Sequence, residues 1–230
     1  MTEQELLQIE NHSNLNLVLL SGPPSSGKTS LLFQFAFNVA DSTNRNVVFI
    51  CNPRRLEAKP PFLSQGIQPS SHVFERIQMK YVNDDEDIKK CFAAFHLYDT
   101  LPAAVIIDDF GDFFNDRVCQ ERYSNSRGRD LAMVRNLALC RNAITYANGK
   151  GSCMLLLSDT HHGNSPRLYF VYKKWIPTIF TIQEGDEPGS FILKGKSYSG
   201  TDNSGRIKAA RYSISLQALL LDTVIEDQVE

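Results

Sequence analysis

Residues 22–29 form an octet in which two glycines enclose four residues and are followed at once by Lys28 and Thr29. An apolar run at 15–20 precedes the octet, and an apolar stretch without Gly or Pro follows it at 31–40. These patterns predict a strand, a glycine-rich turn and a helix, in that order. Both the spacing and this context are typical of a P-loop, the turn that binds the phosphates of a nucleotide.

The residue types of the octet suit that chemistry. Glycine lets the backbone bend so that several N–H groups converge on one phosphate, and the start of the following helix adds positive potential. We expect Lys28 to neutralise the β- and γ-phosphates and the Thr29 hydroxyl to ligate Mg²⁺. The expected nucleotide-binding residues are Gly22, Pro23, Pro24, Ser25, Ser26, Gly27, Lys28, Thr29 and Ser30.

A P-loop also predicts a metal-holding carboxylate at the end of a neighbouring strand. The apolar run at 103–107 ends in Asp108 and Asp109, as expected for a buried parallel strand. Asp108 is the candidate that would hold Mg²⁺ together with Thr29. Asp109 is a candidate for positioning water, and a helix or turn cap is its alternative role. The candidate catalytic residues are therefore Lys28, Asp108 and Asp109. Because no guanine-reading NKxD motif follows, ATP is favoured over GTP.

The rest of the chain predicts an α/β fold, with a mostly parallel sheet flanked by helices and antiparallel strands at the C-terminal edge. Short β runs separated by Gly-rich turns begin at 176 and account for that edge. We expect one domain over residues 1–221 and a short acidic tail at 222–230. Further strands are predicted at 46–51, 73–81 and 152–160, helices at 84–98 and 129–147, and loops at 52–71 and 111–128. The two strand candidates between Lys28 and Asp108 predict at least one strand inserted between the P-loop strand and the Asp108 strand.

The charge pattern is segregated although the total is nearly neutral. The 230 residues carry 24 Lys and Arg against 26 Asp and Glu, so any nucleic-acid binding must use a local patch. Residues 105–121 hold five acidic residues and one arginine, whereas residues 122–141 hold five arginines and one aspartate. A solvated charged face is the alternative to DNA contact. The candidate DNA-binding residues are Arg122, Arg127, Arg129, Arg167, Lys173 and Lys174, with Trp175 as a residue that could stack on bases or belong to the core.

Cysteine usage and the start of the chain bear on the compartment. The five cysteines include no CxxC pair, which argues against a disulfide scaffold and fits a reducing environment. The first five residues are acidic where a presequence would be basic, and no apolar run approaches the length of a membrane helix. We therefore expect a cytosolic or nuclear protein without a membrane partner.

Four segments resemble the RecA-like recombinase paralogues, most closely the SWIM-domain-protein-associated ATPase of that group. The segments are GPPSSGKTSLLFQFA, VVFICNPRRLEAKPPF, FERIQMKY and AAVIIDDFGDFF, all in the first half of the chain. The resemblance implies a RecA-like core that binds ATP and single-stranded DNA. It further implies pairing with a SWIM-domain zinc protein and assembly of recombinase filaments in homologous recombination repair, hence in the nucleus.

The chain also departs from that family. RecA-like ATPases carry a Glu after the second strand to polarise the attacking water, but Asn52 and Pro53 follow Cys51 here, and Glu57 is out of register. The strand expected to end in a polar switch residue, often Gln, ends in residues 157–160, Leu-Ser-Asp-Thr. These departures predict weak, DNA-dependent ATP hydrolysis. Two alternatives remain: a P-loop small-molecule kinase with Arg122, Arg127 and Arg129 as a lid, and a non-catalytic nucleotide-dependent scaffold.

Overall fold

A ten-stranded sheet organises the protein, as seen in a computed structural model that describes residues 17–64, 67–161, 163, 168–197, 208–215 and 218–226. The strands are β1 (Leu17–Gly22), β2 (Val47–Cys51), β3 (Leu63–Ser64), β4 (Ile77–Tyr81), β5 (Ala104–Ile107), β6 (Met154–Thr160), β7 (Thr178–Glu184), β8 (Ser190–Ser197), β9 (Lys208–Ser215) and β10 (Ala218–Glu226). The helices are α2 (Lys28–Thr43), α3 (Pro53–Ala58), α4 (Asp85–Ala93), α5 (Arg117–Arg122), α6 (Ser126–Asn148) and α7 (Tyr169–Trp175).

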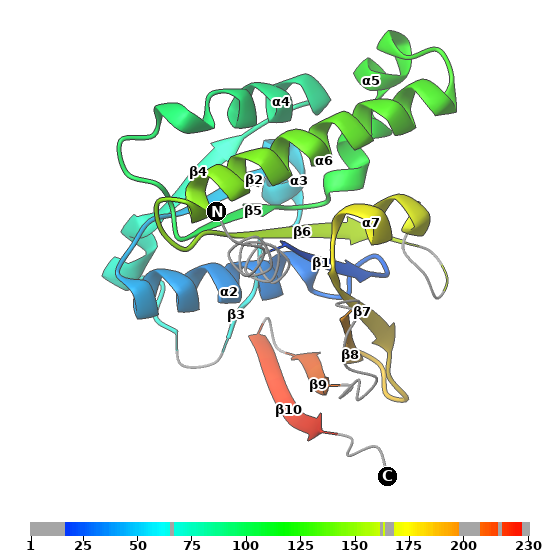
Figure 1. The fold of residues 1–230 in the computed structure, drawn as a ribbon. Coiled ribbons are helices and arrows are strands. Elements are labelled where there is room, and N and C mark those ends of the chain that lie inside the picture. Colours follow the sequence, from blue (N-terminus) through cyan, green and yellow to red (C-terminus); the bar gives the residue numbers. More distant parts are fainter. Residues whose placement is uncertain are drawn as a thin grey trace, which may run out of the picture.

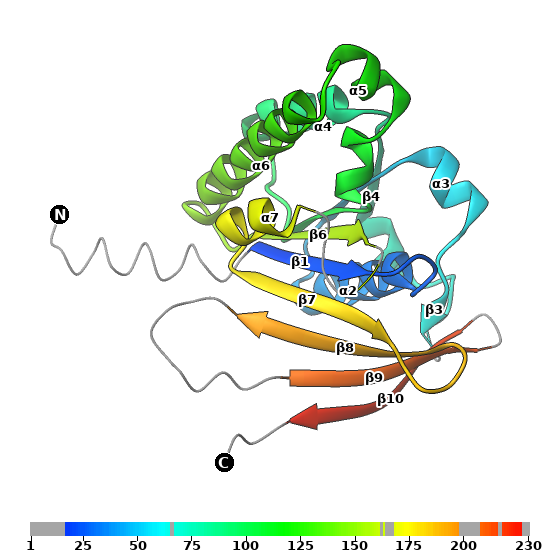
Figure 2. The same ribbon diagram turned by 90° about the vertical axis from the view of Figure 1, so that its right-hand side faces the viewer.

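The strand order across the sheet is β3-β10-β9-β8-β7-β1-β6-β5-β2-β4. The strands from β7 to β4 in this order run parallel, whereas β7, β8, β9 and β10 pair antiparallel in succession. Figure 2 shows the antiparallel strands extending away from the parallel half. The predicted fold, a mostly parallel sheet with antiparallel strands at the C-terminal edge, is confirmed.

Helices cover both faces of the parallel half, with α4, α6 and α7 on one face and α2 on the other (Figure 1). Every residue of β2 and β5 is buried, because a parallel strand between two helical layers has no solvated side. One apolar cluster includes Phe92 of α4 and Met133 of α6, and a second includes Leu32 and Ala36 of α2. Because β1, β6, β5, β2 and β4 pair in parallel, their carboxyl ends lie at one common edge of the sheet.

The inserted strand was predicted, but from the wrong part of the chain. β6 lies between β1 and β5, with Leu19 beside Leu157 and Ile107 on the other side of the same residue. β2 and β4, the two candidates from the segment before Asp108, lie beyond β5 instead. The strand next to the P-loop strand therefore comes from residues after Asp108.

Three local expectations differ from the structure. Residues 72–76 form a 3₁₀ turn that Ser71 caps, so β4 begins only at Ile77. The loops expected at 52–71 and 111–128 contain α3, β3 and α5; a proline opens α3 at a position where its missing N–H costs no hydrogen bond. Residues 222–226, expected in a tail, belong to β10 because they pair with β9 as far as Glu226 beside Lys208. Within the described residues, no helix is both long and apolar enough to cross a bilayer.

Candidate nucleotide-binding site

The P-loop joins β1 to α2 at the carboxyl edge of the parallel strands. The backbone is left-handed at Ser25, with φ of 61°, and at Gly27, with φ of 77°. The positive φ favours glycine at position 27, and a Cβ there would also lie 2.7 Å from Cδ1 of Ile214, which would have to shift. The loop thus reaches the start of α2 in the bent form that a P-loop requires.

Lys28 is buried at the first position of α2, with 6% of its surface exposed. Its Nζ donates to the carbonyl of Pro23 at 2.9 Å and to that of Gly22 at 3.3 Å. Burial lowers the pKa of the ammonium, while the carboxylates of Asp109 and Asp108 act in the opposite direction. A cation held among loop carbonyls beside two carboxylates is well placed to neutralise a phosphate.

Thr29 and Asp108 are brought together across the edge of the sheet. The Thr29 hydroxyl donates to Oδ2 of Asp108 at 2.8 Å, and the Ser158 hydroxyl donates to Oδ1 at 2.7 Å. Burial, and then the neighbouring Asp109, raise the pKa of Asp108 to about 6, although the two hydroxyl donors lower it. A hydroxyl and a carboxylate oxygen 2.8 Å apart are hard oxygen ligands, the kind that Mg²⁺ takes. The residues present therefore fit Mg²⁺.

Asp109 is held in an unusual backbone conformation, with φ of 50°. Its N–H donates to the Ser158 hydroxyl at 2.8 Å, and its Oδ1 accepts from the Thr160 hydroxyl at 2.6 Å. It precedes the 3₁₀ turn at Phe110–Phe114, but its side chain makes no cap hydrogen bond to that turn. The alternative role as a cap is therefore not the one observed. The end of β6 instead orients both carboxylates, since Ser158 donates to the Asp108 carboxylate and Thr160 donates to the Asp109 carboxylate.

The segment after β2 does not place a carboxylate at this edge. Asn52 follows β2, and its side chain accepts from the Arg54 N–H at 3.1 Å, which caps α3. Glu57 lies on the exposed side of α3. Farther along, Lys59 donates to the Ser25 hydroxyl at 3.3 Å, bringing a second cation to the P-loop.

Two further contacts to the loop were not predicted from the sequence. The hydroxyl of Tyr212, in β9, donates to the Ser26 carbonyl at 2.6 Å. The Phe62 N–H donates to the Ser30 hydroxyl at 2.9 Å, so the side chain of Ser30, expected to bind nucleotide, supports the backbone near β3. No sequence motif predicts either contact, because each joins a loop residue to a distant segment whose position depends on the arrangement of the sheet.

The candidate DNA-binding residues that the structure describes lie on three helices, α5, α6 and α7. Arg122 is paired with Asp84 at 2.9 Å and with Asp85 at 2.5 Å, and its side chain is 32% exposed. This arginine therefore joins α5 to α4, and two carboxylates compensate its charge. Arg127 and Arg129 lie near the start of α6, where Arg127 is exposed.

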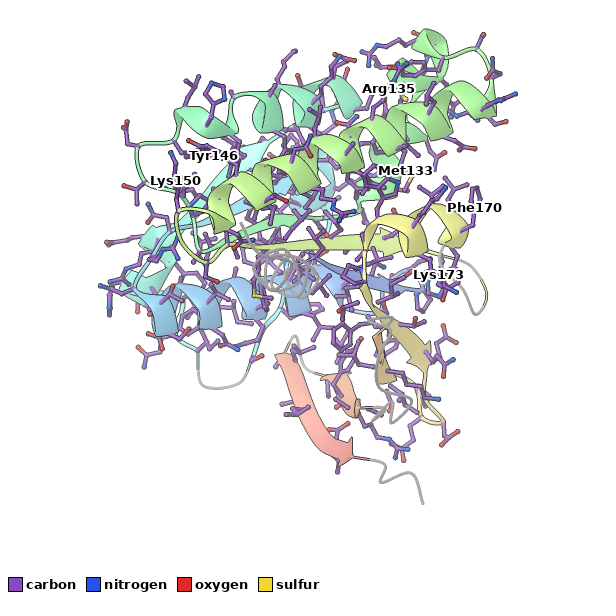
Figure 3. All side chains as sticks on the ribbon, viewed as in Figure 1. Met133, Arg135, Tyr146, Lys150, Phe170 and Lys173 are labelled. Atoms are coloured by element: carbon purple, nitrogen blue, oxygen red, sulfur yellow. The ribbon has the colours of Figure 1, made fainter. Side chains whose placement is uncertain are left out.

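The remaining candidates lie near α7. Lys173 and Lys174 are exposed in its last turn, and Figure 3 shows Lys173 and the 70% exposed Phe170 projecting from this helix at the surface. Trp175 packs against the core in a half-buried position. Arg167 lies outside the described residues. Among the candidates for DNA binding, exposed basic side chains thus lie at the start of α6 and at the end of α7.

Together the P-loop, the Thr29–Asp108 pair and the inserted β6 define a P-loop nucleotide-binding fold in which a strand separates the P-loop strand from the strand of the metal-holding carboxylate. Comparison with solved structures specifies the fold. The chain is similar to a KaiC-like protein, PH0186, from the hyperthermophilic archaeon Pyrococcus horikoshii OT3, with a TM-score of 0.62 and 16% identity over 90% of this chain and 89% of that one. It is similar to the RadB recombinase, with a TM-score of 0.62 and 15% identity over 89% of both chains.

These likenesses show that the chain has the fold of RecA-like P-loop ATPases. No family model matches the sequence, and no curated protein does.

Proposed function

We propose that this chain is a RecA-like ATPase that binds ATP with Mg²⁺ and promotes recombinase filament assembly on single-stranded DNA together with a SWIM-domain zinc protein. The observation that carries nucleotide binding is the 2.8 Å contact between the Thr29 hydroxyl and Asp108, beside the buried Lys28. Lys28 and the N–H groups of the loop bind the phosphates, while Thr29 and Asp108 supply metal ligands. Mg²⁺, when bound, neutralises charge on the phosphates.

Hydrolysis is proposed to be slow. Asn52 caps α3 at the position where RecA-like ATPases carry the Glu that polarises water, and Glu57 is exposed. Asp109 lies at the site, where the Thr160 hydroxyl orients it at 2.6 Å, and the carboxylates of Asp159 and Asp112 also act on Lys28. None of these aspartates follows β2, where RecA-like ATPases carry the water-polarising Glu, so we infer that ATP acts mainly as a ligand for assembly.

The role in recombination rests on two supports. The fold is shared with a protein described as a recombinase, and exposed basic residues lie on α6 and α7. Arg127, Arg129, Lys173 and Lys174 would contact phosphates of single-stranded DNA without reading its sequence. We propose that the protein acts with its SWIM-domain partner and recombinase in the nucleus, in DNA repair by homologous recombination.

The small-molecule kinase is disfavoured. Such kinases usually lack an inserted strand between the P-loop strand and the carboxylate strand, whereas β6 occupies that position here. Arg122, one of the three arginines expected in a kinase lid, is bound to Asp84 and Asp85 of α4. Both observations favour the ATPase over the kinase.

Nucleotide binding is tested with a fluorescent ATP analogue, titrated with and without Mg²⁺. We expect Mg²⁺-dependent binding by the natural chain and a loss of at least about 100-fold in affinity for Lys28→Ala, since a buried charged partner of the phosphates is removed. Lys89→Ala, which removes a half-exposed lysine of α4, is the matched control and should bind normally. Equal binding by Lys28→Ala and Lys89→Ala would refute the assignment.

Partners are tested by affinity purification of the tagged chain from cells, followed by identification of the proteins that co-purify. We expect a SWIM-domain protein or a recombinase. Their absence, combined with transfer of phosphate from ATP to a small molecule by the pure chain, would support the kinase instead.

A further inference from the structure

Tyr212 connects the antiparallel edge of the sheet to the P-loop. It lies in the middle of β9, beside Phe191 of β8 and Leu221 of β10, and only 2% of its surface is exposed. Its ring stacks on that of Phe191, with centroids 5.5 Å apart. Burial raises the pKa of the phenol well above its ordinary value, so the hydroxyl stays protonated. Tyr212 is therefore a fixed hydrogen-bond donor.

The acceptor of this donor is the carbonyl of Ser26, at 2.6 Å. In a trans peptide the C=O and the following N–H point in opposite directions. No peptide in the described residues is cis, so the carbonyl that faces Tyr212 turns the Gly27 N–H toward the other side of the loop. Since converging N–H groups bind the phosphate in a P-loop, the hydroxyl of Tyr212 fixes the direction of one of them.

The Ser26–Gly27 peptide needs such a contact because the residue after it is glycine. Gly27, with φ of 77°, has backbone freedom that other residues lack, and a rotation of the Ser26–Gly27 peptide meets little intrinsic resistance. The β9–β10 pair also packs beside Gly27, because Ile214 and Leu219 side chains lie within 4 Å of the position a Gly27 Cβ would take. Ser26 is itself buried, and its hydroxyl donates to the Pro23 carbonyl at 2.9 Å.

We propose that Tyr212 is a positioning residue for the nucleotide site: it holds the Ser26–Gly27 peptide in the phosphate-binding orientation and so makes nucleotide affinity depend on the β9–β10 edge of the sheet. This inference rests on the proposed binding of nucleotide. By the reciprocity of linked equilibria, bound nucleotide also stabilises β9 and β10.

The test uses Tyr212→Phe, which removes the hydroxyl and keeps the ring, in the full chain. Ser213→Ala is the matched control, because it removes a hydroxyl from the same strand that donates to Asp222 rather than to the loop. Hydrogen–deuterium exchange of residues 22–30 is measured without nucleotide, and affinity for the fluorescent ATP analogue is measured separately. We expect about two- to ten-fold faster exchange and about two- to ten-fold weaker binding for Tyr212→Phe, the effect of one hydrogen bond, and no change for Ser213→Ala.

A second variant, Ile214→Ala, loosens the packing over Gly27 and leaves the hydrogen bond in place, and it should also speed exchange in residues 22–30. Exchange and affinity in Tyr212→Phe equal to those of the natural chain would overturn the inference while nucleotide binding stood. If the natural chain and Lys28→Ala both failed to bind the analogue, the proposed function would fall. The exchange measurement without nucleotide would still decide whether Tyr212 orders the loop.

Discussion

Replacing Asp108 by asparagine should stabilise the nucleotide-free protein while removing its Mg²⁺-dependent binding of nucleotide. Asp108 now accepts from the Ser158 hydroxyl at 2.7 Å and from the Thr29 hydroxyl at 2.8 Å. Asparagine would keep this geometry, because its carbonyl oxygen can accept from Ser158 and its amide can donate to the Thr29 hydroxyl. What the change removes is a negative charge in a site that disfavours it.

The magnitude follows from the pKa of Asp108, which is raised from 3.8 to about 6. A shift of roughly two units corresponds to about 3 kcal/mol, an upper limit on the gain in the free energy of unfolding. Because the folded-state pKa exceeds the unfolded one, the folded state binds the proton more tightly. The contribution of Asp108 to the free energy of unfolding is therefore fully present below about pH 4 and is lost as the pH rises to about 6. The Asp108→Asn protein should not lose this stability as the pH rises, because asparagine does not ionise.

The assay is urea unfolding between pH 4 and 8, without nucleotide and with a chelator present. At pH 7.5 we expect the free energy of unfolding of Asp108→Asn to be about 1–3 kcal/mol higher than that of the natural chain. This difference should become smaller as the pH falls from 6 to 4. Asp186→Asn, in the exposed turn between β7 and β8, is the matched control and should change little. Addition of ATP with Mg²⁺ should stabilise the natural chain more than Asp108→Asn.

Two results would refute this reasoning. The first is an Asp108→Asn protein that is no more stable than the natural chain at pH 7.5. The second is a difference in stability that does not vary between pH 4 and pH 6, since the gain is attributed to the charge alone.

Arg122→Ala should lower the free energy of unfolding by about 2–3 kcal/mol, because it leaves the buried Asp85 without its cation. Arg117→Ala, which breaks an exposed ion pair, should cost less than about 1 kcal/mol in the same urea denaturation, and equal losses would contradict the assignment of Arg122 to structure. The double change of Arg127 and Arg129 to Ala should weaken binding of single-stranded DNA several-fold. It should also reduce the slope of log affinity against log salt by about 1.4, as measured by fluorescence anisotropy, whereas Arg122→Ala should leave that slope unchanged. An unchanged slope in the double variant would show that Arg127 and Arg129 do not contact the phosphates of DNA.

The features that local sequence determined are those confined to a few neighbouring residues. The spacing of Gly22, Gly27 and Lys28 predicts the P-loop because the bend, the left-handed glycine and the start of α2 all depend on backbone angles within that segment. The apolar run before Asp108 likewise predicts a buried strand with a carboxylate at its end. The antiparallel edge followed from short β runs and Gly-rich turns after 176.

The tertiary structure decided which of these pieces meet. β6, not the strands before Asp108, lies between the P-loop strand and the Asp108 strand, since strand order depends on how helices pack on both faces. Arg122 was interpreted from its local charge cluster, but its partners are Asp84 and Asp85 on another helix. Tyr212 reaches Ser26 across 186 positions of sequence. No periodicity or spacing encodes such contacts, because they arise only when the register of the whole sheet places the two segments side by side.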